Sequence, residues 1–292
     1  MIFDRDSRRK AFSHAITVLG GLSVLVVLIP LASVLYTAAV RGGAVLLNPA
    51  FYTAGNPLPC SSISCQTVGI GPDIEGTAIL LGLSGAISTA VGVSAAIFAS
   101  EYRTYGLGRA ISFTADVLTG VPSIIMGVFI YSFFVLYDPT LAFSATTGTL
   151  ALSILMIPIV VRTTEEALHT VPNSLREAAL ALGMPKWRTT VRVVLATAFP
   201  GILTGILLAM MRAAGEAAPL LLTGFGSRLF FQGMNVPIAA LPLLIYNYAE
   251  SGSPNFLKVA WGATLLLMIL VLTANVLSRL SIQRMVRRMG GR

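Results

Sequence analysis

The chain has 292 residues, of which 55% are hydrophobic and 11% are charged. Soluble domains carry about 25% charged residues, so this composition excludes a soluble enzyme, a disordered chain and a disulfide-stapled secreted module. At about 20 apolar residues for each membrane crossing, the chain can supply about six crossings. The net charge of +8 is typical either of a nucleic-acid-binding protein or of a membrane protein with a basic face. The positions of the charges decide between the two.

Six long uncharged segments predict six membrane-spanning helices, and hence an all-α membrane protein. They cover residues 15–40, 76–100, 111–137, 147–161, 199–223 and 259–278. The first segment is longer than the apolar region of a signal peptide, about 7–15 residues, so we expect it to be retained. We divide the chain into a tail (1–14), the first span (15–40), an external loop (41–75), a transmembrane core (76–280) and a basic tail (281–292).

The basic residues lie mainly on one side of the predicted spans. Of the 20 lysines and arginines, 16 fall in the two terminal segments and in the loops after the second and fourth spans. The positive-inside rule therefore predicts that both termini and these two loops are cytoplasmic, in a multi-pass protein of the cytoplasmic membrane. Topology accounts for the basic charge, and we expect no nucleic-acid partner.

The sequence contains no recognisable energy source for transport. Its three lysines, Lys10, Lys186 and Lys258, all lie outside the Gly-x-x-x-x-Gly-Lys-Ser/Thr pattern of nucleotide-binding loops. The predicted spans contain only two carboxylates, Asp116 and Glu216, which is too few for a proton relay. We therefore expect a partner to drive the protein. We also expect this chain to bind no cofactor and to have no ATPase site.

The two cysteines, Cys60 and Cys65, lie together in the predicted external loop. On the oxidising side of a bacterial inner membrane they can form a local disulfide, although their spacing is equally compatible with two unpaired thiols. The two histidines, His14 and His169, fall on the cytoplasmic side. Because the four residues cannot meet in one tetrahedral zinc site, we expect no metal.

The cytoplasmic loop after the fourth span contains a short helix, predicted at 174–183. Ser174 is a favoured N-cap residue, and Glu177 completes a capping box. Gly183 supplies a left-handed C-terminal turn, and Pro185 begins the next helix. One apolar stripe is expected along this helix, formed by Leu175, Ala178, Ala179 and Leu182. Such a helix can dock in a groove of another protein or lie at the membrane interface.

Glu177, Ala178, Ala179 and Gly183 resemble the EAA signature of the membrane subunits of ATP-binding-cassette (ABC) importers. That signature normally ends in Ile-x-Leu-Pro, where residues 193–196 of this chain read Val-Val-Leu-Ala, but the coupling helix is intact. Three further motifs, in the same order, resemble PstA-type permeases of phosphate importers. They are Gly-Val-Pro-Ser-Ile-Ile-Met-Gly (120–127), Arg-Ala-Ala-Gly-Glu-Ala-Ala-Pro-Leu-Leu-Leu-Thr (212–223) and Pro-Ile-Ala-Ala-Leu-Pro (237–242).

This resemblance covers residues 70–280 and implies a type I ABC importer (MetI-like) permease fold that translocates inorganic phosphate. It also implies the partners: a second, homologous permease (PstC type), two ATPase subunits that use ATP (PstB type), an external phosphate-binding protein (PstS type) and the lipid bilayer. The residues expected to couple the chain to an ATPase are Leu175, Glu177, Ala178, Ala179, Leu182 and Gly183.

The fifth predicted span contains a charged pair. Arg212 lies thirteen residues into the span, where an arginine costs at least about 2.5–3.5 kcal/mol to insert. Glu216 follows one helical turn later and can pair with it. Gly215 and Pro219 interrupt the same helix. Because transporters place substrates at broken helices near the membrane midplane, this segment is predicted to meet the substrate.

The third predicted span has a matching break. Pro122, close to Gly120, is expected to free the carbonyl of Leu118. Thr119 and Ser123 add two hydroxyls to one face of the helix. We predict that these hydroxyls line the substrate pathway together with the charged pair of the fifth span.

Two interpretations of the charged pair are open. Arg212 can bind an oxygen of phosphate through its planar guanidinium while Glu216 accepts the hydroxyl proton of hydrogen phosphate, a proton that sulfate lacks. Alternatively, the two side chains satisfy each other and only join helices. For the whole protein, the alternatives are a permease for sulfate, molybdate or phosphonate, a stand-alone channel or ion-coupled carrier, and a membrane-embedded enzyme.

Overall fold

The computed structural model describes residues 3–55, 69–102 and 106–290. Within these residues the regular structure is helical, and the one β-type pairing is an isolated bridge between Phe225 and Ile238. The all-α fold class is confirmed. In chain order the elements are α1 (Phe3–Leu46), α2 (Ala50–Thr53), α3 (Gly71–Glu101), α4 (Gly106–Thr119), α5 (Ser123–Tyr137), the 3-10 turn η1 (Pro139–Leu141), α6 (Ala145–His169), α7 (Asn173–Ala181), α8 (Lys186–Thr189), the π-turn η2 (Thr190–Val194), α9 (Leu195–Ala213), α10 (Ala218–Thr223), α11 (Leu241–Glu250) and α12 (Pro254–Gly290).

Five helical segments in the described residues are long and apolar enough to cross a membrane. They are α1, α3, α6, the continuous run of α8, η2 and α9, and α12. The pair of α4 and α5 makes a sixth, but it is bent by 107°. The number of segments agrees with the sequence prediction, whereas the third segment is a sharply bent pair and not one helix.

Several helix ends differ from the predicted spans. α6 continues to His169, past the predicted end at residue 161, because Arg162 and Glu165 find polar partners on α4 and on each other. α9 ends at Ala213, and the rest of the predicted fifth span forms the separate helix α10. α1 and α3 both extend into the segment 41–75.

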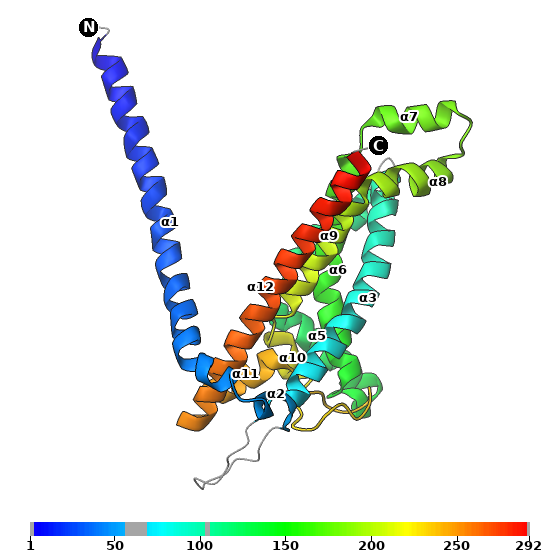
Figure 1. Ribbon diagram of the computed structural model, residues 1–292. Coiled ribbons are helices and arrows are strands. Elements are labelled where there is room, and N and C mark those ends of the chain that lie inside the picture. The colour runs from blue at the N-terminus through cyan, green and yellow to red at the C-terminus, as the bar shows by residue number, and fades with distance from the viewer. Residues whose placement is uncertain (1–2, 56–68, 103–105, 291–292) are drawn as a thin grey trace.

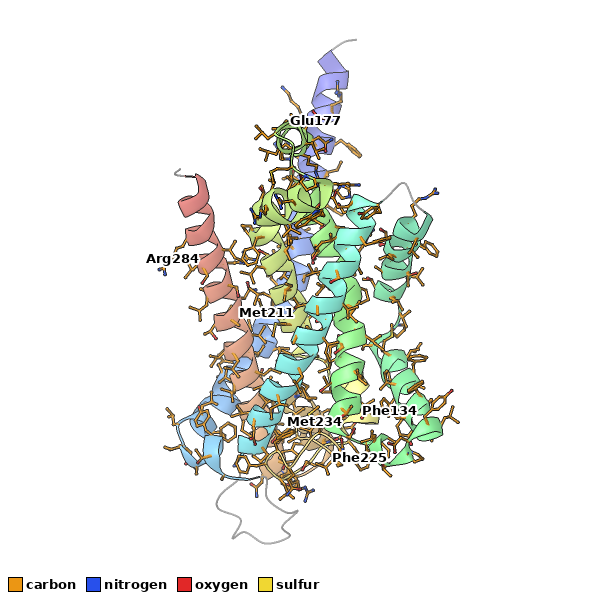
Figure 2. The ribbon with its side chains drawn as sticks, turned by 90° about the vertical axis from the view of Figure 1, so that its right-hand side faces the viewer. Phe134, Glu177, Met211, Phe225, Met234 and Arg284 are labelled. Atoms are coloured by element: carbon orange, nitrogen blue, oxygen red, sulfur yellow. The ribbon has the colours of Figure 1, made fainter. Side chains whose placement is uncertain are left out.

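The centre of the bundle is formed by α3, α6 and α9, which run side by side in Figures 1 and 2. Ser84, Ser88 and Gly92 of α3 are buried. A Cβ atom on Gly92 would lie 2.8 Å from a side-chain atom of Val160 on α6. Small residues of this kind let helix backbones approach closely where no hydrophobic effect drives association in lipid. The α3–α6 contact is therefore closely packed, backbone against backbone.

α1 stands away from the bundle along most of its length (Figure 1). It touches α12 near its own C-terminal end, where a Cβ on Gly42 would meet the Trp261 carbonyl oxygen at 2.5 Å. The beginning of α1, the end of α12 and the hairpin of α7 and α8 lie at one end of the molecule, and α2 and α11 lie at the other (Figure 1). This arrangement separates a hairpin end, which carries α7 and α8, from a loop end.

Candidate transport and coupling sites

The fifth membrane segment breaks between α9 and α10. α9 ends at Ala213 and α10 begins at Ala218. Between them the Gly215 N–H donates to the Arg212 carbonyl at 3.2 Å and closes a turn. Pro219 occupies the first turn of α10, where a proline removes no helical hydrogen bond. Pro219 therefore starts a new helix and does not kink a continuing one.

Arg212 belongs to the last turn of α9, and Glu216 lies in the turn that follows. Arg212 Nε and Glu216 Oε1 are 3.8 Å apart, and the two side chains are 55% and 21% exposed. In the described chain this ion pair is the one polar contact of the Arg212 guanidinium. Met211, beside it in sequence, lies between the two ends of the bundle in Figure 2. Arg212 thus lies at the end of a helix and not inside a continuous one. Its position suits a cation, because helix carbonyls point toward it.

The bend between α4 and α5 lies at Gly120, Val121 and Pro122. The residue before a proline is sterically pushed out of the α-helical conformation, and Gly120 adds freedom to the turn. The Val121 N–H donates to the Leu118 carbonyl at 3.2 Å. The prediction that this carbonyl is free is therefore wrong, because the tight turn supplies its own donor.

Thr119 and Ser123 flank this bend, one at the end of α4 and the other at the start of α5. The Thr119 hydroxyl donates to the Ala115 carbonyl at 2.8 Å, and Ser123 is half-buried. Among the described residues no hydrogen bond or ion pair joins either hydroxyl to Arg212 or Glu216. In the single chain, the residues predicted to line one pathway lie at two separate helix breaks.

The two breaks are nevertheless packed together, through α5 and α10. A Cβ on Gly127 of α5 would lie 2.7 Å from the Cα and 2.8 Å from the carbonyl oxygen of Pro219 on α10. Only glycine permits such an approach between two backbones. The third and fifth membrane segments are thus held to each other beside their broken ends.

Replacing Gly127 by alanine is expected to separate α5 from α10 and to destabilise the chain by about 1–3 kcal/mol, the usual cost of overpacking. Thermal unfolding of the purified protein in detergent measures this loss. Gly82→Ala on α3 is the matched control, because a Cβ there meets nothing within 4 Å. Equal melting of the two variants would contradict the close packing of the breaks.

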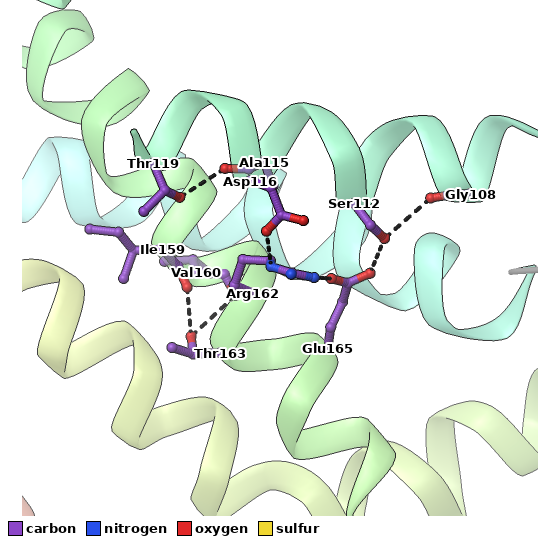
Figure 3. A network of polar contacts seen from close by, with 10 residues as sticks. All are labelled: Gly108, Ser112, Ala115, Asp116, Thr119, Ile159, Val160, Arg162, Thr163 and Glu165. Carbon is purple, nitrogen blue, oxygen red and sulfur yellow. Dashed lines mark hydrogen bonds and ion pairs between the residues drawn. The ribbon is translucent and has the colours of Figure 1, made fainter. Parts of the chain in front are cut away.

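A polar network joins α4 to α6 (Figure 3). Arg162 Nε lies 2.6 Å from Asp116 Oδ1, and Arg162 Nη1 lies 3.1 Å from Glu165 Oε2. The Glu165 carboxylate also accepts a hydrogen bond from the Ser112 hydroxyl, and its side chain is only 7% exposed. A carboxylate held this deep needs a charged partner and hydrogen bonds. The network faces a cleft of about 510 Å³ that is also lined by Arg109, Phe113, Glu166 and His169.

Sequence reasoning missed this network. Arg162 and Glu165 were assigned to a cytoplasmic loop because the uncharged run ends at residue 161. Their spacing of three residues, which places both on one helical face, was the available signal. Their partner Asp116 comes from a helix that no local pattern connects to them.

α7 and α8 form a hairpin that projects from one end of the bundle (Figure 1), and Glu177 lies on it in Figure 2. Gly183 has a φ of +79°, the left-handed conformation that favours glycine. Around it the Met184 N–H donates to the Ala179 carbonyl at 3.2 Å and the Gly183 N–H to the Leu180 carbonyl at 2.9 Å. These two bonds form the helix-ending motif expected at Gly183.

The start of α7 differs from the predicted capping box. The helix begins at Asn173, and the residue before it, Pro172, caps it without a side-chain hydrogen bond. The Leu175 N–H donates to the Pro172 carbonyl at 3.2 Å. Because the fixed backbone of proline already turns the chain into the helix, Ser174 lies inside the helix and makes no box with Glu177.

The predicted apolar stripe is divided between two faces. Ala179 is buried against the bundle, whereas Leu175 and Ala178 are exposed and Leu182 is 84% exposed. Trp187 of α8 is also exposed. Of this predicted stripe Ala179 alone is buried, and the larger apolar side chains of the hairpin point outward.

The loop between α10 and α11 closes the opposite end of the bundle. It supplies acceptors to the start of α6: the Ala145 N–H donates to the Val236 carbonyl at 2.9 Å and the Thr146 N–H to the Met234 carbonyl at 3.0 Å.

On α11, burial raises the pKa of Tyr248, so its phenol is neutral at physiological pH. The possible Cys60–Cys65 disulfide lies outside the described residues.

Membrane-crossing helices, two packed helix breaks and a projecting hairpin define a transport permease subunit. The fold is similar to that of a chain from the MetNI methionine ABC transporter in an inward-facing conformation, with a TM-score of 0.61 and 20% identity, covering 73% of this chain and 95% of that one. The predicted type I, MetI-like importer fold is confirmed.

Residues 88–291 match the family described as binding-protein-dependent transport system inner membrane component, and the chain belongs to this family. It is 37% identical to the phosphate transport system permease protein PstA of Haemophilus influenzae, covering 94% of this chain and 95% of the relative. It is 39% identical to the phosphate transport system permease protein PstA 1 of Mycobacterium tuberculosis H37Rv, covering 92% of this chain and 87% of the relative.

Proposed function

We propose that this chain is the permease subunit that carries inorganic phosphate in an ATP-driven importer. The observation that carries the proposal is its identity of 37% and 39% with phosphate transport permeases over more than nine-tenths of its length. A match of this extent includes both helix breaks and the coupling hairpin, the features on which transport would depend.

The chemistry of Arg212 and Glu216 supports phosphate as the substrate. The Arg212 guanidinium is more than half exposed and makes one long ion pair, so most of its N–H donors are available to an oxyanion. Glu216, as a carboxylate, can accept the proton of hydrogen phosphate, and sulfate has no such proton. The hydroxyls of Thr119 and Ser123 would contribute to binding the anion at the other helix break.

The proposed partners follow from the side chains that remain exposed in the single chain. Arg212 is exposed in the single chain, so a second, homologous permease would be needed to close the pathway around it. Leu175, Leu182 and Trp187 project from the hairpin, which suits docking into a groove on an ATPase subunit. Two ATPase subunits would supply the ATP-binding sites, and an external phosphate-binding protein would deliver the substrate.

The proposed orientation places both termini and the hairpin in the cytoplasm. The beginning of α1, the end of α12 and the α7–α8 hairpin share one end of the molecule (Figure 1). The loops and tails assigned to that end hold 16 of the 20 basic residues, which favours the cytoplasmic side.

Co-purification tests the proposed function. We expect an ATPase subunit to be recovered with the wild-type chain and to be lost with a Glu177→Ala/Gly183→Val double variant, because Gly183 holds a left-handed turn that valine cannot adopt without strain. Asn255→Ala, an exposed change at the other end of the molecule, should leave recovery intact. Phosphate transport by this chain alone in liposomes would refute the importer and support a carrier.

A further inference from the structure

The α7–α8 hairpin contacts the end of α3 at Glu101. The Glu101 carboxylate forms an ion pair with Arg176 of α7. The Glu101 main-chain carbonyl accepts a hydrogen bond from the Lys186 ammonium at 3.1 Å, and Lys186 is the first residue of α8. One residue of α3 therefore contacts both legs of the hairpin.

The contacts around Glu101 are shielded and reinforced. The side chains of Glu101 and Arg176 are 8% and 22% exposed, so their attraction is screened less than that of a surface pair. Arg176 also donates to the Leu168 carbonyl of α6 at 3.1 Å. The Lys186 ammonium lies 4.6 Å from the ring centre of Tyr102, and a cation at the C-terminal end of a helix such as α3 is favoured by its dipole.

The two elements joined at Glu101 lead to distant parts of the molecule. Lys186 begins a continuous helical segment that ends at Ala213, beside Arg212. At 1.5 Å per residue this segment is about 40 Å long. α3 runs to the opposite end of the bundle. There the Glu75 carboxylate accepts a hydrogen bond from the Phe231 N–H at 3.1 Å, and the Thr77 hydroxyl accepts a hydrogen bond from the Leu241 N–H at 2.8 Å.

We propose that Glu101 is a positioning residue for ATP coupling, which rests on the proposed function. By fastening both legs of the hairpin to α3, it makes a displacement of the hairpin move α3 and the α8–α9 segment together. Without this attachment α7 can swing on its short connections, at Val171–Pro172 and Met184–Pro185, while the membrane segments, including α8, stay in place. ATP hydrolysis then continues, but less of it drives transport.

The test uses the complete complex in proteoliposomes and measures phosphate uptake and ATP hydrolysis in the same sample. We expect Glu101→Gln to assemble normally and to lower uptake per ATP by about tenfold, the lower end of the range for one lost charge-assisted hydrogen bond. Arg176→Gln should have a similar effect. The double variant should be no worse than either single variant, since both remove one interaction. Arg192→Gln, an exposed cation of η2 that has no ion pair in the described structure, is the control.

Hydrogen exchange supplies a second, positional readout. In Glu101→Gln, the amides of α7 (173–181) should exchange faster, because the substitution removes its ion pair, while those of the α3–α6 contact stay protected. An unchanged ratio of uptake to ATP hydrolysis, or a double variant whose losses add, would overturn the inference. If Glu101→Gln fails to assemble, Arg176→Gln takes its place with the same expected losses. A wild-type complex that takes up no phosphate would instead refute the proposed function and leave the role of Glu101 to the exchange measurement.

Discussion

Phosphate uptake is expected to fall to background when either Arg212 or Glu216 is replaced by alanine, while the complex still assembles. A hydrogen bond to a charged group contributes about 1.5–3 kcal/mol, or about 10- to 150-fold in affinity, and the guanidinium can make two such bonds to one oxyanion. Uptake of labelled phosphate into proteoliposomes or cells measures the loss, and co-purification of the ATPase measures assembly.

Conservative variants at the same positions separate charge from geometry. Arg212→Lys keeps the charge but loses the planar donor pair, so we expect partial uptake. Glu216→Gln keeps the shape but presents an amide in place of a carboxylate, so phosphate should lose its advantage over sulfate. Lys258→Ala is the control, because it removes an exposed cation from the far end of α12. Normal uptake in both alanine variants would refute the substrate site.

The alternative role of the pair, joining the helix ends, makes a different prediction. If Arg212 and Glu216 only satisfy each other, each single alanine variant should lower thermal stability, and the double variant should regain part of it. The 3.8 Å separation and the exposure of Arg212 argue for a small stability effect, since exposed pairs contribute about 0–1 kcal/mol.

Replacing Arg162 by alanine is expected to destabilise the folded chain by about 2–3 kcal/mol. The change leaves the Glu165 carboxylate, 7% exposed, without its cation and with the Ser112 hydroxyl as its remaining partner. Breaking a fully buried pair costs about 3–5 kcal/mol, and we expect less here because the Arg162 side chain is 42% exposed. Unfolding of the purified chain in detergent and denaturant measures the difference.

A double variant tests whether the buried charge is the cause. Arg162→Ala/Glu165→Gln removes both the cation and the stranded carboxylate, so its loss should be smaller than that of Arg162→Ala alone. Arg109→Ala is the matched control, because Arg109 is an exposed arginine of the same cleft without an ion pair in the described structure. Equal destabilisation by Arg109→Ala and Arg162→Ala would contradict the role given to the network.

Local features of the fold were accessible from sequence because they depend on neighbouring residues. The number of membrane segments follows from apolar length, and the left-handed turn at Gly183 follows from the absence of a Cβ. The ends of the helices were harder to predict from the sequence. Pro172 replaced Ser174 as the cap of α7, and Ala213 ended a helix whose apolar character continues into α10.

Contacts between segments could not be predicted from the sequence. Glu101 and Arg176 are 75 residues apart, and Ser112 and Glu165 are 53 apart. Hydropathy and helical period describe one segment at a time, so they assign a charge near a span end to a loop. Only packing shows that Glu165 is buried and that Glu101 meets both legs of the hairpin.

The sequence by itself determined that this is an α-helical membrane permease with a short helix between its fourth and fifth spans, and it located the charged pair and the breaks at Gly120–Pro122 and Gly215–Pro219. The tertiary structure decided that the first break is a 107° bend, that Gly127 brings the two breaks into contact, and that Arg212 lies exposed at a helix end. The reason is physical: a proline or glycine weakens a helix through its own backbone, whereas the angle and the partner of the break depend on what the neighbouring helices leave room for.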